Sequence, residues 1–116
     1  MTEVCKVSVE REGTAAILHT RGYINNVGGE EIASTAYDLM GDGVTTLLLD
    51  LKETKIVNSI GISILIEIVE KMMEKEGKVA FCALTPVIHK TFQIMGLAQY
   101  AAIFPDEETA RKDLPI

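Results

Sequence analysis

Ser59 is the residue of this chain whose type and position are best suited to chemistry. It follows Asn58 at the predicted start of a helix, directly after a strand-like run and a short polar segment. Backbone N–H groups without partners and the positive end of the helix dipole meet at such a position, and both favour a phosphate group. From residue types alone, Ser59 is a candidate phosphate acceptor, and the open alternative is a plain capping serine.

The helix predicted from Asn58 to about Glu76 would position this serine. Either Asn58 or Ser59 could cap the helix, and Gly77 is a typical residue for its C-terminal end. Apolar residues cover most of the helix, and one polar stripe runs along it. The stripe consists of Ser59, Ser63, Glu67, Glu70, Lys71 and Glu74.

Strand-like and helical segments alternate along the rest of the chain. Asn26 is predicted to cap the first helix, and Thr85 followed by Pro86 is a strong start signal for a later one. Strands are expected at residues 4–10, 14–20, 44–51, 78–84 and 100–104, and loops at 21–29 and 52–57. The helices are expected after Asn26, after Asn58, from Thr85 to Gly96, and from Pro105 to about Lys112.

This order predicts an α/β fold with a small mixed β-sheet, an opening hairpin and about four helices. The chain has 116 residues, of which 47% are hydrophobic and 24% charged, so one globular domain over residues 1–116 is expected. Cys5 and Cys82 lie in apolar runs and are predicted to be buried free thiols.

The charge balance argues against several partners. The net charge is −6 and no basic stripe is present, which speaks against nucleic acid and against an anionic membrane surface. The N-terminus lacks the apolar run of a signal peptide, and the longest apolar stretch is too short to span a bilayer. A cytoplasmic protein without direct membrane insertion is expected.

Enzymatic chemistry finds little support in the sequence. A serine hydrolase would need a glycine where Val57 stands, and the spacing of His19 and His89 does not suggest a catalytic triad. The sequence shows no clustered metal ligands and no phosphate-binding loop after a strand. No catalytic residue, no metal site and no cofactor are therefore expected.

The segment IVNSIGISIL (residues 56–65) resembles the D-S-x-G signature of STAS domains, which include the bacterial anti-sigma-factor antagonists. RGYIN (21–25) is similar to the family's G-x-apolar-D element. FCALTP (81–86), FQIMGL (92–97) and DEETA (106–110) are similar to its later strand–helix pattern and its final acidic helix. The resemblance covers nearly the whole chain in the family's order.

The resemblance implies a small mixed sheet with helices largely on one side, and a regulatory binding module instead of an enzyme. The implied partner is an anti-sigma factor that is also a serine kinase. Phosphorylation at Ser59 would break that complex, and a phosphatase would restore it. The implied partner-binding residues are Asn25, Asn26, Asn58, Ser59, Ile60 and Ser63.

Two asparagines depart from the family pattern. Asn58 and Asn25 stand where the resemblance expects aspartates, and Ile60 stands where many relatives carry a second serine. Asparagine keeps the capping ability of aspartate but loses its charge. The alternative function is therefore a STAS subunit of a signalling scaffold or lipid-transport complex without phosphorylation control. The oligomeric state stays open.

Overall fold

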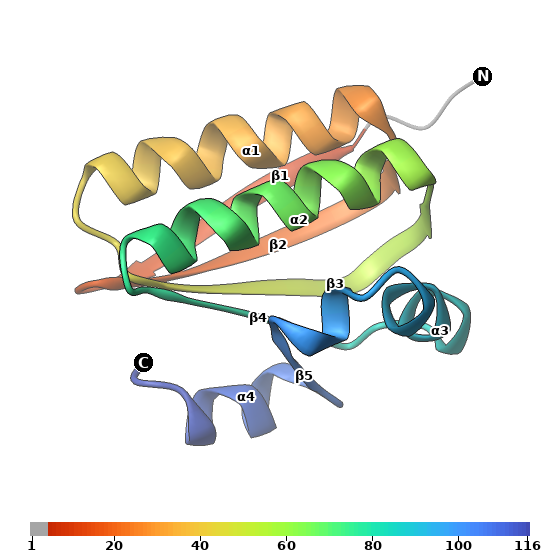
Figure 1. Cartoon of the computed structure of the whole chain (residues 1–116). Coiled ribbons are helices and arrows are strands. Elements are labelled where there is room, and N and C mark those ends of the chain that lie inside the picture. Colours follow the sequence, from red (N-terminus) through yellow and green to blue (C-terminus); the bar gives the residue numbers. More distant parts are fainter. Residues whose placement is uncertain (1–4) are drawn as a thin grey trace.

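The computed structural model describes residues 5–116 and contains one five-stranded sheet in the order β1-β2-β3-β4-β5 (Figure 1). The strands are β1 (Lys6–Glu12), β2 (Ala15–Ile24), β3 (Thr46–Val57), β4 (Lys78–Cys82) and β5 (Ala102–Phe104). The helices are α1 (Asn26–Gly41), α2 (Ser59–Glu74), α3 (Pro86–Ile94), the short 3₁₀ helix η1 (Leu97–Gln99) and α4 (Glu107–Asp113). No helix within the described residues is both long and apolar enough to cross a membrane.

The predicted fold class is confirmed. β1 and β2 pair antiparallel across a turn at Gly13, whose φ of 63° lies in the left-handed region that glycine tolerates. β2, β3, β4 and β5 pair in parallel, and helices connect them as crossovers, so the sheet is mixed. The first predicted strand began at residue 4, which lies outside the described residues.

Helices cover both faces of the sheet. α1 and α2 lie side by side on one face, where Ile32 of α1 and Leu65 of α2 are fully buried in the main core (Figure 1). α4 lies on the opposite face and packs Ala110 against a smaller cluster that includes Ile17 and Cys82. The resemblance implied helices largely on one side, and α4 is the exception. Cys5 and Cys82 are buried free thiols, as predicted.

β2 and β3 extend further than the sequence predicts. The expected loops at 21–29 and 52–57 are wrong, because β2 continues to Ile24 and β3 to Val57. Two polar residues of these strands are partners across the sheet: the hydroxyls of Thr20 and Thr54 are buried and hydrogen-bond to each other. Because both strands are longer than predicted, β2 and β3 end next to each other at the same edge of the sheet.

The end of α2 also differs from the prediction. The helix ends at Glu74 instead of Glu76, and the left-handed residue after it is Glu76, with a φ of 59°, and not Gly77. Glycine is required at position 77 for a steric reason, because a Cβ there would lie 2.7 Å from the carbonyl oxygen of Thr45.

Candidate functional site

The site predicted around Ser59 is built on two neighbouring strand ends. Ile24 at the end of β2 pairs with Val57 at the end of β3, so Asn25 and Asn58 follow adjacent positions of the sheet. The backbone N–H of Asn58 donates to the carbonyl oxygen of Ile24 at 3.1 Å and ties the two ends together. α1 and α2 both begin at this edge and run in the same direction (Figure 1).

Each asparagine caps the helix that follows it. The side-chain oxygen of Asn25 accepts from the N–H of Gly28 at 2.9 Å, and that of Asn58 accepts from the N–H of Gly61 at 2.8 Å. The capping prediction for Asn58 is confirmed. The prediction for Asn26 is wrong, because β2 reaches Ile24 and leaves Asn25 as the extended residue before the helix.

Two glycines bring the helix starts close to the strand ends. A Cβ on Gly61 would lie 2.3 Å from the carbonyl oxygen of Ile24, and a Cβ on Gly28 would lie 2.7 Å from that of Tyr23. Backbone atoms separated by so little space leave no room for a side chain. The first turn of α2 is therefore held rigidly against the sheet, and Ser59 with it.

Ser59 is the first residue of α2, and its side chain is exposed. Asn26 is exposed, Asn25 and Asn58 are half-buried, and Ile60 is 54% exposed. Ser63 lies one turn further along α2, where it is exposed and its hydroxyl donates to the carbonyl oxygen of Ser59 at 3.0 Å. A group added to Ser59 would meet the first N–H groups of α2 without disturbing the core.

Exposed apolar side chains occur at the edge of the sheet where β2, β3 and β4 end and where α1, α2 and α3 begin, which is also the edge that carries Ser59. We call Val27, Ile56, Ile60 and Val87 the apolar rim; they are 54–76% exposed. Val27, Ile60 and Val87 belong to the first turns of α1, α2 and α3, and Ile56 lies at the end of β3. Of these four residues, sequence reasoning identified only Ile60. Val27 and Val87 could have been identified because each is an apolar residue in the first turn of a helix but outside the face that contacts the core.

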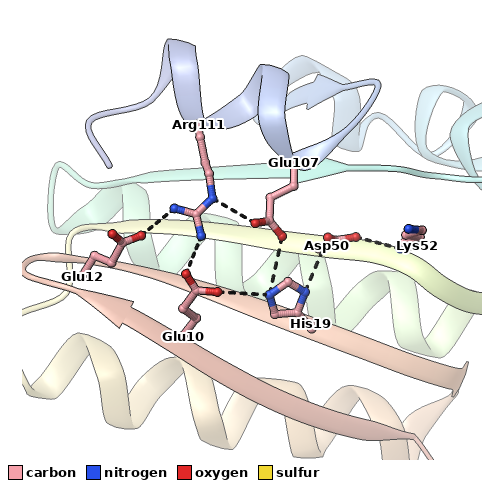
Figure 2. A network of polar contacts seen from close by, with 7 residues as sticks. All are labelled: Glu10, Glu12, His19, Asp50, Lys52, Glu107 and Arg111. Carbon is pink, nitrogen blue, oxygen red and sulfur yellow. Dashed lines mark hydrogen bonds and ion pairs between the residues drawn. The ribbon is translucent and has the colours of Figure 1, made fainter.

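A second polar cluster lies under α4, on the other face of the sheet (Figure 2). Arg111 of α4 forms ion pairs with Glu10 and Glu12 of β1 and with Glu107 of its own helix. His19 of β2 lies among Glu10, Glu107 and the nearly buried Asp50. Sequence reasoning missed this cluster, since it joins residues of β1, β2, β3 and α4 that lie far apart in the chain.

Burial and hydrogen bonds shift the titration of this cluster. Burial raises the pKa of the Asp50 carboxyl, and its hydrogen bond to Glu107 acts in the same direction. Burial also opposes the charge of Glu107, but hydrogen bonds from Arg111 and Asp50 outweigh it and lower the pKa of Glu107. Hydrogen bonds to Glu107, Glu12 and Glu10 raise the pKa of Arg111.

Solved structures share this fold. The crystal structure of an anti-sigma factor antagonist from Mycobacterium paratuberculosis superimposes with a TM-score of 0.85, at 19% identity and full coverage of both chains. Bacillus SpoIIAA, an anti-sigma factor antagonist, is also similar. Its unphosphorylated form gives a TM-score of 0.80 at 17% identity, covering 93% of this chain and 95% of that one. Its phosphorylated form gives 0.74 at 16% identity, covering 94% and 100%.

Sequence comparison agrees with the fold. The chain is 21% identical over 100 residues to BtrV of Bordetella bronchiseptica, a candidate anti-sigma factor antagonist, and the match covers 86% of this chain and 84% of BtrV. The model of the STAS domain family matches residues 6–110, which include all five strands, the helices α1, α2, α3 and η1, and the first four residues of α4. The chain therefore belongs to the STAS domain family.

Proposed function

We propose that this STAS domain is a regulatory binding module of the anti-sigma factor antagonist type, switched by phosphate on Ser59, and not an enzyme. Its partner is an anti-sigma factor with serine kinase activity, and a phosphatase resets the switch in the cytoplasm. The observation that carries the proposal is the exposed position of Ser59 at the N-terminus of α2, with the apolar rim in the neighbouring segments.

The apolar rim supplies the binding surface. Exposed Val27, Ile56 and Val87 lose contact with water when a partner covers this edge, and that burial favours association. Ser59 and the amide groups of Asn25 and Asn58 supply polar contacts within the same surface. Protein interfaces combine buried apolar contacts with direct hydrogen bonds, and this surface offers both.

A phosphate on Ser59 opposes this association directly. It carries about −1.5 to −2 charges at neutral pH and must lose water when the partner covers it. Each 1.4 kcal/mol corresponds to about a tenfold change in affinity, so a hundredfold switch needs only about 3 kcal/mol. The fold itself tolerates the phosphate, because a helix N-terminus favours a negative charge. The existence of both phosphorylated and unphosphorylated SpoIIAA structures supports this expectation.

The direct test is intact-mass and peptide mass spectrometry of the protein isolated from its native cells, looking for phosphate on Ser59. Binding to the anti-sigma factor kinase is then measured for Ser59→Ala and Ser59→Asp. The alanine variant is expected to bind like wild type, and the aspartate variant at least about tenfold more weakly. Ser34→Asp, an exposed serine within α1, is the matched control and should not change binding. Equal affinities for all three variants would refute the switch.

The second candidate function is a STAS subunit of a larger scaffold or lipid-transport complex without phosphorylation control. The observation in its favour is that Asn25 and Asn58 are both neutral and both use their side-chain oxygens as helix caps. Neither can act as a base toward the serine hydroxyl at neutral pH. Absence of phosphate on Ser59 in native protein, and after incubation with the kinase, would favour this candidate.

A further inference from the structure

One imidazole and two carboxylates converge between α4 and the opening hairpin. His19 comes from β2, Glu10 from β1, and Glu107 is the first residue of α4 (Figure 2). We propose that these three side chains bind a divalent transition-metal ion of the zinc class, and that the ion fastens α4 to the hairpin. The site lies on the opposite face of the sheet from α1 and α2 and is independent of the proposed switch at Ser59.

The spacing of the three ligand atoms fits an ion. Nε2 of His19 lies 3.5 Å from Oε1 of Glu107 and 3.8 Å from Oε1 of Glu10. All three atoms lie within 4.8 Å of one another. Metal–ligand bonds of about 2.1 Å in a tetrahedral site place ligand atoms about 3.4 Å apart. The observed separations exceed good hydrogen-bond lengths but need only small side-chain movements to surround one ion.

The other nitrogen of His19 supplies an independent indication. Nδ1 lies 3.5 Å from Oδ2 of Asp50, whose side chain is only 9% exposed. The second oxygen of Asp50 is held by the backbone N–H of Lys52 at 2.9 Å. A carboxylate behind the ring is how proteins orient metal-binding histidines. In this orientation Nε2 of His19 faces the carboxylates of Glu10 and Glu107, which is the side on which an ion would be bound.

Arg111 positions the two acidic ligands. Its Nε donates to Oε2 of Glu107 at 2.9 Å, and its Nη2 donates to Oε2 of Glu10 at 2.5 Å. The guanidinium therefore occupies one oxygen of each carboxylate and leaves the other oxygen directed toward His19. Arg111 balances only one of the three carboxylates that it contacts, those of Glu10, Glu12 and Glu107, so two negative charges remain to balance a divalent ion.

The ligand types select the metal class. One imidazole with carboxylates suits zinc and its neighbours in the first transition row, whereas magnesium and calcium prefer oxygen ligands alone. His19 and Asp50 also line a hollow of about 490 Å³ that extends along β1 and β2. The three ligand side chains are themselves partly exposed, at 38% for His19, 49% for Glu10 and 26% for Glu107, so an ion can reach them from solvent and water can complete its coordination.

The test is calorimetric titration of the full-length, chelator-treated protein with zinc chloride at pH 7.5. We expect one zinc ion per chain, and we expect His19→Gln to weaken binding at least tenfold. His89→Gln is the matched control, because His89 is exposed on α3 and outside the cluster. Zinc should also raise the melting temperature of wild type and of the His89 variant, but not that of the His19 variant. Absence of zinc binding by wild type at millimolar concentration, or equal binding by the two variants, would overturn the proposal.

A second measurement keeps the test independent of how the His19 variant folds. In amide NMR spectra of the wild type, zinc should shift resonances of Glu10, His19 and Glu107 and leave those at the start of α2 unchanged. Glu107→Gln should weaken binding while the pattern of unaffected resonances stays that of the wild type. Shifts confined to other regions of the chain would refute the site. Magnesium at the same concentration should produce none of these changes.

Discussion

Gly61→Ala should destabilise the domain although alanine is a better helix former than glycine. The added Cβ would lie 2.3 Å from the carbonyl oxygen of Ile24, 2.9 Å from its Cγ2 and 3.0 Å from its carbonyl carbon. An unstrained carbon–oxygen contact is about 3.3 Å or longer, so the strand end and the helix start must separate by about 1 Å. The same carbonyl accepts the hydrogen bond of Asn58, and the separation weakens that bond.

The magnitude follows from three effects. Overpacking of this kind costs about 1–3 kcal/mol, and a weakened backbone hydrogen bond adds about 0.5–1.5 kcal/mol. Replacing glycine inside a helix contributes about 0.5–1 kcal/mol in the opposite direction. The free energy of unfolding should therefore fall by roughly 1–3 kcal/mol, since the steric and hydrogen-bond effects outweigh the helix preference. For a domain of this size the melting temperature should fall by roughly 5–15 °C.

Urea denaturation followed by circular dichroism measures this change. Gly41→Ala is the matched control, because Gly41 is the last residue of α1 and a Cβ there meets no atom within 4 Å. That variant should be unchanged or more stable by up to about 1 kcal/mol. Opposite signs for the same substitution would establish that the contact with Ile24 decides the effect. Equal or increased stability of Gly61→Ala would refute the close approach of α2 to the end of β2.

Asn58→Asp should raise the rate of serine phosphorylation by about 10²-fold or more in a kinase time course, because a positioned carboxylate supplies the missing base; an unchanged rate would show that asparagine is no handicap. Burial raises the pKa of Cys82 to about 12 and also raises the pKa of Cys5, so a thiol reagent at pH 8 should label neither cysteine until urea unfolds the protein. Prompt labelling of the native protein would contradict this. Burial, together with the hydrogen bond to Glu67, raises the pKa of Tyr37 to about 12. Because the pKa of Tyr37 is higher in the folded than in the unfolded state, the protonated phenol contributes stability that is present below pH 10 and is lost as the pH rises toward 12. Glu67→Gln should lower the pKa of Tyr37 measured by ultraviolet titration.

Local sequence signals determined the helix starts. Asn58, Thr85 and Asp106 each cap a helix through a hydrogen bond to the backbone N–H three residues later. Such a bond depends only on residues that are close in the chain, so residue type and spacing suffice to predict it. The position of Ser59 at the start of α2, and hence the candidate phosphorylation site, could be predicted for the same reason.

The lengths of β2 and β3 depended on partners that local patterns do not include. Residues 52–57 look like a polar loop in isolation, yet Thr54 is buried against Thr20 and extends the strand. That extension also decided which asparagine caps α1, because the cap is the first residue after the strand ends. Because β2 continues to Ile24, the capping residue is Asn25 and not Asn26.

The cluster under α4 was decided by the tertiary structure alone. Glu10 and His19 are brought together by the hairpin register, and Glu107 joins them only because α4 packs on the face of the sheet opposite α1 and α2. Helix packing is driven by the burial of apolar side chains such as Ala110. The polar residues of α4 do not decide which face of the sheet the helix covers, so their neighbours follow from the apolar packing. Residue spacing could therefore predict a helix containing Glu107, whereas its neighbours depended on the face of the sheet that the helix covers.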